Sequence, residues 1–246
     1  IMKSNLKICK DKIIRMLDFI KVEYNDVISK YSEEGIIQKA IPLRVVKEVD
    51  KNKRKEINDL IYLIFSPSLK QMSKMIDAGI IEWAEISKKV ELKEIIDNEE
   101  LLIELFYESH EKLYIYKQIK YNLTFDFIMQ MYLFFEKEIV LFVQNNFVSS
   151  KCNNIFSAIK IMEKNLNYNI DAETKKGIDL YRNIINVYKH GYGDSFISIM
   201  NSNPELLNYT DKDEDMFFVF KLDKINIEEL YNHIIKFLEE LYQIVS

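Results

Sequence analysis

The sequence has few of the residues that interrupt helices: three prolines and five glycines among 246 residues. Sheet proteins need such residues for their many turns, so this scarcity favours long helices. With 48% hydrophobic and 30% charged side chains, the chain can bury a core, which argues against a disordered protein. We therefore predict an all-α fold, built as a helical bundle.

Cysteine is equally scarce. Cys9 and Cys152 are the two thiols of the chain, and neither lies in a CxxC pair. This excludes a disulfide framework and predicts a reducing, cytoplasmic location. The sequence also lacks a phosphate-binding glycine loop, a G-x-S-x-G turn and an H-E-x-x-H pair, so we expect no metal and no cofactor.

The sequence has no uninterrupted apolar run long enough for a membrane span. The most apolar stretch, residues 125–143, contains Asp126, Gln130 and the charged triplet 136–138. Such polarity at the centre predicts a buried bundle helix, with no membrane partner. Residues 1–10 mix charged with apolar side chains, which is not typical of a secretory signal.

An excess of positive charge is also missing, since the net charge is -5 and the pI about 5.5. This argues against a protein that binds nucleic acid or anionic membranes over its whole surface. Acidic residues are concentrated in residues 201–246, which contain 4 basic and 10 acidic side chains. Residues 120–200 contain 9 basic and 8 acidic side chains. A local positive field would come from Lys175, Lys176, Arg182 and Lys189.

Apolar residues recur at three- and four-residue spacing along most of the chain, which predicts amphipathic helices. The expected helices cover residues 4–30, 54–65, 66–79, 98–121, 125–145, 153–167, 172–190 and 227–244, with short helices after residues 79 and 195. Brief extended segments are expected at 43–46 and 216–222, and Asn122–Thr124 is expected to form a break between the helices 98–121 and 125–145. We expect an N-terminal helical region, 1–121, and a bundle of four or five antiparallel helices, 122–246.

The stretch RNIINVYKHGYGDS, residues 182–195, gathers basic, amide and imidazole side chains before a glycine. Arg182, Asn186 and His190 stand at i, i+4 and i+8, so a helix places all three on one stripe. A histidine can exchange protons near neutral pH. The stripe therefore contains candidates for acid–base chemistry on an anionic substrate.

This stretch resembles the HEPN superfamily of small helical-bundle proteins, many of which are metal-independent endoribonucleases in toxin–antitoxin and antiphage defence systems. The family motif is an arginine followed, after four to six residues, by a histidine near the end of a helix, often R-N-x-x-x-H. Asn186 and His190 match that pattern, whereas Ile185 occupies the arginine position. The nearest arginine is Arg182, one turn upstream.

The resemblance covers residues 122–246 and implies RNA cleavage without a metal, leaving a cyclic phosphate. It implies that the catalytic residues are His190, Arg182 and Asn186. In the implied mechanism, His190 moves the proton of a ribose 2′-hydroxyl while Arg182 or Lys189 stabilises the phosphate charge. Lys189, Tyr188 and Asn183 are the expected substrate-binding residues. It further implies a homodimer and a possible antitoxin or other protein partner.

Several alternatives stay open beside this hypothesis. A helix that ends in Lys-His-Gly is common, because basic residues and glycine both suit a helix C-terminus. The alternative function is that of an inactive HEPN-like or other helical protein that acts as an interaction or sensor subunit. His110, His233 and the acidic run 211–215 are expected to be solvated or amphipathic positions rather than metal ligands.

Overall fold

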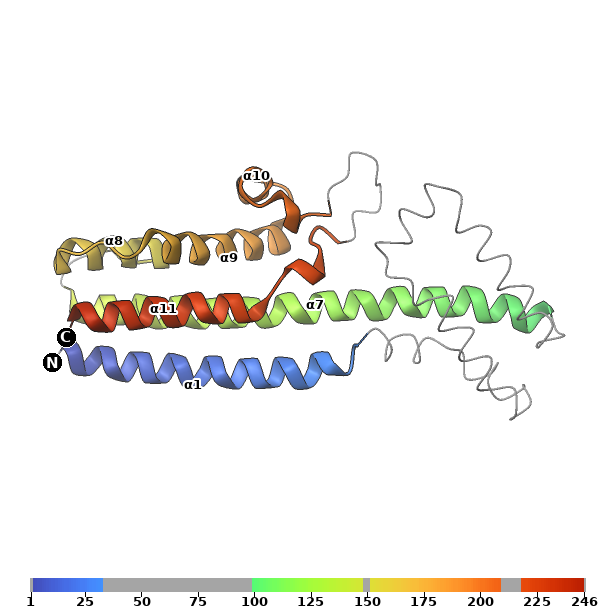
Figure 1. Ribbon diagram of the computed structural model, residues 1–246, viewed down its shortest axis with the longest axis horizontal. Helices are drawn as coiled ribbons and strands as arrows, with labels where there is room; N and C mark the ends of the chain where they lie inside the picture. Colours follow the sequence, from blue (N-terminus) through green and yellow to red (C-terminus); the bar gives the residue numbers. More distant parts are fainter. Residues whose placement is uncertain (1, 33–98, 148–150, 209–217, 246) are drawn as a thin grey trace. The chain divides into compact units, whose positions relative to one another are not determined.

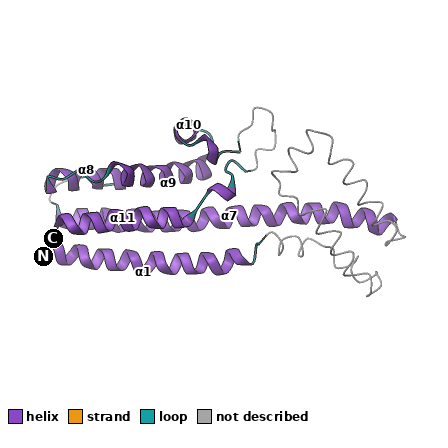
Figure 2. Cartoon of the chain, in the orientation of Figure 1, coloured by secondary structure: helices purple, strands orange, loops and turns teal. Residues whose placement is uncertain are grey.

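The computed structural model describes residues 2–32, 99–147, 151–208 and 218–245, and in these ranges it is helical, without a named strand (Figure 2). The all-α prediction is thus confirmed. The predictions for residues 33–98, including three helices and the 43–46 segment, lie outside the described residues. The elements are α1 (Met2–Ser29), α7 (Glu99–Asn146), α8 (Ile155–Leu166), α9 (Ala172–His190), α10 (Asp194–Ser202), η1 (Pro204–Leu206), η2 (Leu222–Lys224) and α11 (Ile227–Val245).

The chain divides into two compact units. One unit, called the bundle below, contains α1 up to Asn25 and the described residues from Tyr121 onward. The other lies between Asp26 and Lys120, and within it the rings of Tyr31 and Tyr116 have centroids 6.5 Å apart. The first part of α1 therefore packs with the C-terminal helices, whereas the sequence division at residue 121 assigned it to the N-terminal region. That division itself stays a prediction.

In the bundle, α1, α11 and the second part of α7 run alongside one another, with α8 and α9 packed against them (Figure 1). Each of these helices buries one apolar stripe, as the helical spacing predicts. The stripes meet at fully or almost fully buried side chains such as Ile13, Phe135, Ile184 and Phe237. At the rim, Lys12 of α1 binds Glu138 of α7 at 2.7 Å, an ion pair that links two of the helices.

The predicted break at Asn122–Thr124 is wrong, because α7 continues through it as one helix of 48 residues. No glycine or proline interrupts this stretch, and asparagine and threonine each cost a helix only a few tenths of a kcal/mol. Tyr121, Thr124 and Phe125 are all buried, so packing favours continuity here. Among the helices in the described ranges, none has the length and apolar character that crossing a bilayer requires.

The two thiols lie in the core. Cys9 of α1 donates from Sγ to the carbonyl oxygen of Glu138 at 3.7 Å, and Cys152 is also buried. Burial is the main cause that raises the pKa of the Cys9 thiol to about 12. Because the thiolate is the reactive form, Cys9 is an unreactive structural residue in the folded chain.

Gly177 lies in the middle of α9, where glycine weakens a helix by roughly 1 kcal/mol relative to alanine. A close helix contact explains it: a Cβ at position 177 would lie 2.4 Å from the imidazole of His233 on α11. His233 is thus a packing residue at the α9–α11 contact, and its ring also lies 6.5 Å from that of Tyr181.

We expect Gly177→Ala to lower the free energy of unfolding by about 1–3 kcal/mol, because the new methyl group overlaps the imidazole ring. Chemical denaturation measures this change. His233→Ala in the same chain removes the ring and should recover most of the loss, giving a favourable coupling energy in the double-mutant cycle. Additive effects of the two substitutions would contradict this account of the contact.

Asp171 begins α9 as its N-cap: its carboxylate accepts from the Thr174 backbone N–H at 3.0 Å and from Lys236 of α11 at 2.9 Å. The hydrogen bond from Lys236, followed by that from Thr174, lowers the pKa of Asp171 to about 2. The folded-state pKa is therefore below the unfolded value of about 3.9, so the ionised carboxylate stabilises the fold.

This stabilisation is fully present above about pH 5 and is lost as the pH falls from about 4 through about 2. We expect the stability difference between the wild-type chain and Asp171→Asn to be constant from pH 5 to 7 and to shrink on acidification over that window. Thermal melts of both chains between pH 2 and pH 7 measure it. A difference that does not change with pH would contradict the role of the charged cap.

Candidate functional site

The candidate site lies on α9, whose bounds agree with the predicted helix 172–190. The helix ends at His190, and the C-cap Gly191 has a positive φ of 72°, which glycine adopts without strain. The backbone N–H of Gly191 still donates to the Val187 carbonyl at 2.8 Å, so the last turn is complete. This turn carries Lys189 and His190, and both side chains are exposed.

Arg182 is directed away from His190 by two partners. One guanidinium nitrogen lies 2.9 Å from the Asp179 carboxylate, one turn earlier on α9. The guanidinium carbon lies 4.7 Å from the centroid of the Phe156 ring on α8, within the range of a cation–π contact. Arg182 therefore joins α8 to α9.

The charge of Arg182 also acts on a buried phenol, Tyr132. The hydroxyl of Tyr132, on α7, and Nε of Arg182 are both buried without a hydrogen-bond partner among the described residues. Burial, and then the charge of Glu136, raise the pKa of Tyr132, while the Arg182 charge acts in the opposite direction. This effect on a core phenol fits a structural role for Arg182.

Ile185, which occupies the arginine position of the family motif, is almost fully buried. It belongs to the apolar face of α9, so no cation at that position could reach a substrate in this fold. From Arg182 to His190, eight residues at 1.5 Å each give about 12 Å of rise along the helix. Arg182 and His190 share a stripe by their Cα positions, but the guanidinium is not brought to the imidazole.

Two amides of α9 connect it to α10. The Asn186 amide nitrogen donates to the Ser195 hydroxyl at 3.3 Å. Asn183 is only 5% exposed, and its amide nitrogen lies 3.5 Å from the Ser198 hydroxyl and 3.4 Å from the Asp179 carboxylate. Asn183 is thus shielded from a large substrate, and Asn186 positions α10 and the loop before it.

Tyr188 is half-buried among aromatic residues. Its ring stacks on that of Phe125 with centroids 4.9 Å apart and an interplanar angle of 16°, and its hydroxyl lies 3.4 Å from the Asp126 carboxylate. Burial, and then the Asp126 charge, raise the pKa of Tyr188. Tyr188 therefore fixes the end of α9 against α7.

The side chains at the end of α9 that are exposed to solvent are thus Lys189 and His190, followed by Tyr192 in the connection to α10 and by Asp194, the first residue of α10. The sequence did not indicate Tyr192 as a site residue. The signal that could have identified it is its position two residues after His190. Within the described residues, no group of three histidine, cysteine or carboxylate side chains is placed to hold a metal ion.

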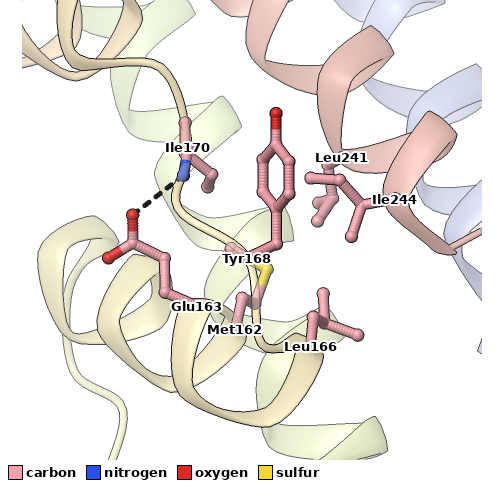
Figure 3. A pocket seen from close by; sticks show the side chains of 7 residues that line it. All are labelled: Met162, Glu163, Leu166, Tyr168, Ile170, Leu241 and Ile244. Carbon is pink, nitrogen blue, oxygen red and sulfur yellow. Dashed lines mark hydrogen bonds between the residues drawn. The ribbon is translucent and has the colours of Figure 1, made fainter.

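A shallow depression lies elsewhere in the bundle, between the end of α8 and the end of α11 (Figure 3). Its walls are almost entirely apolar, and Tyr168, Leu166 and Leu241 are among the lining residues. Its acidic residue, Glu163, is already bonded to the Ile170 backbone N–H at 2.9 Å and to Lys175 at 2.8 Å. This depression has no side chain available for chemistry.

Comparison of the chain with family models, with curated proteins and with solved structures finds no match.

Proposed function

We propose that this chain is a metal-independent endoribonuclease whose active edge is the last turn of α9, with His190 as the acid–base residue and Lys189 as the cation. The observation that supports this most directly is that both side chains are exposed at the end of α9. Capping and packing contacts hold this helix in place. The HEPN resemblance of Asn186 and His190 supports the same reaction.

In this proposal, His190 takes the proton of a ribose 2′-hydroxyl, and the 2′ oxygen bonds to the adjacent phosphorus. The bond from phosphorus to the 5′ oxygen of the next nucleotide breaks, and that oxygen takes up a proton. Lys189 stabilises the negative charge that develops on the phosphate. The products are a 2′,3′-cyclic phosphate and a 5′-hydroxyl. In a homodimer the two His190 side chains would serve the two proton transfers.

Arg182 is left out of this site, because Asp179 and Phe156 already hold its guanidinium. Asn186 acts as a positioning residue, through its hydrogen bond to Ser195. A role in defence or in a toxin–antitoxin pair, a protein partner and a cytoplasmic location stay predictions that follow from the resemblance and the composition.

A second candidate function is a non-cleaving interaction or sensor subunit. The observation that favours it is the same engagement of Arg182, together with the buried Ile185 at the family's arginine position. In this case the cation that the family motif supplies is absent from the edge, and the bundle serves as a scaffold.

The two candidates differ in one measurement. The purified chain is incubated with total RNA in EDTA, and the new ends are analysed for cyclic phosphate and 5′-hydroxyl groups. Cleavage with these ends, absent from a His190→Ala preparation purified in the same way, is the result expected of the enzyme. Intact RNA, or equal cleavage by both preparations, would leave the interaction subunit as the better explanation.

A further inference from the structure

The Tyr192 side chain is held in place by one ring contact and is exposed to solvent. Its ring packs edge-on against the ring of Phe196, with centroids 4.7 Å apart and an interplanar angle of 72°. Phe196 is buried and belongs to the core, so it anchors this contact. Tyr192 nevertheless remains 53% exposed. A large apolar ring in such a position presents contact area to a ligand at low cost in conformational entropy.

The surroundings of this ring combine charge with apolar surface. Lys189 and His190 precede it and are exposed, while Ile197 and Met200, three residues apart on α10, expose an apolar face. Asp194 adds one exposed carboxylate, which limits how many phosphates the edge can accept. An exposed ring that follows one exposed lysine and one exposed histidine in the chain fits a single nucleotide step rather than a long polyanion.

We infer that Tyr192 stacks on an unpaired base of the RNA, so that the edge accepts single-stranded and not double-stranded RNA. Base faces in an A-form duplex are covered by their neighbours, whereas unpaired bases can stack on aromatic side chains. Lys189 then contacts the adjoining phosphate, and His190 faces the ribose. This inference rests on the proposed function, because it identifies the substrate class of the same edge.

Binding of a fluorescein-labelled single-stranded RNA with 2′-O-methyl riboses, which cannot form the cyclic product, tests the inference by fluorescence anisotropy. We expect Tyr192→Ala to weaken binding by roughly 10-fold or more, as removal of one stacking ring does. Tyr192→Phe keeps the ring and should bind within about twofold of wild type. Tyr168→Ala, at another exposed tyrosine, should leave binding unchanged.

The duplex form of the same RNA should bind more weakly and should not respond to Tyr192→Ala. Equal single-strand binding by wild type and Tyr192→Ala, or an equal response with the duplex, would overturn the inference. So would a Tyr192→Ala effect on self-association, measured by light scattering, without an effect on RNA. Thermal melts of Tyr192→Ala and Tyr192→Phe show whether each variant is still folded.

The outcomes separate this inference from the proposed function. If Tyr192 governs single-strand binding while unmodified RNA stays intact, the cleavage proposal fails and the stacking surface stands. If RNA is cleaved in a His190-dependent way while Tyr192→Ala binds normally, the stacking surface fails and the enzyme stands.

Discussion

Replacement of His190 by alanine is expected to lower the rate of RNA cleavage by at least about 100-fold, since a general acid–base residue contributes 10²–10⁴-fold. The side chain is exposed, so its removal should leave the stability of the bundle almost unchanged. Single-turnover cleavage of a labelled oligonucleotide in EDTA, together with a thermal melt of the same preparation, measures both quantities.

Arg182→Ala is the matched control on the same helix, and it should behave in the opposite way. Loss of the Asp179 ion pair and of the Phe156 contact should cost the fold on the order of 1 kcal/mol, while cleavage remains near the wild-type rate. If instead Arg182→Ala abolished cleavage without changing stability, the guanidinium would have to leave Asp179 and act at the edge. The assignment of the cation to Lys189 would then be wrong.

Phe237→Ala should cause the largest loss of stability, about 3–5 kcal/mol in the free energy of unfolding. The Phe237 side chain of α11 is fully buried, and its ring meets that of Phe135 on α7 edge-on, with centroids 5.4 Å apart. Truncation therefore removes both buried apolar area and an aromatic pair, and it leaves a cavity between two central helices. The melting temperature should fall by roughly 10 °C or more.

Phe19→Ala removes the same atoms from α1, where the ring is 60% exposed, and serves as the control. We expect it to change the free energy of unfolding by no more than about 0.5 kcal/mol. Urea denaturation of both variants compares a buried with an exposed phenylalanine in one chain. Similar losses for the two variants would contradict the assignment of Phe237 to the core.

The helix limits that could be predicted are those with local chemical signals. α9 starts after Asp171, a capping residue, and ends before Gly191, and both limits could be derived from the sequence. Asn226, the residue before α11, accepts from the Glu228 backbone N–H at 2.9 Å, and asparagine is a residue type that favours this position. In α7 the weak signals Asn122 and Thr124 were misleading, because burial of Tyr121 and Phe125 outweighs their low helix propensity.

For the candidate site, the sequence could predict where each residue lies along the helix, but not which partners its side chain contacts. Helical geometry correctly put Arg182, Asn186 and His190 in one helix with regular spacing, but it could not assign their side-chain partners. The Asp179 ion pair was accessible, because i and i+3 residues are neighbours on a helix. The Phe156 contact and the Ser195 hydrogen bond depend on how α8 and α10 pack, which no local pattern encodes.

The burial of Cys9 and Cys152 also has a practical use. Since the sequence contains no other cysteine, a thiol introduced at an exposed position would be the principal target of a maleimide dye in the native protein. Dyes attached to cysteines introduced in place of the exposed Lys164 on α8 and Asn201 on α10 would then report, by energy transfer, whether the distance between these two helices changes when RNA is added. The native thiols need no replacement, so the packing around α1 and α8 would be kept intact.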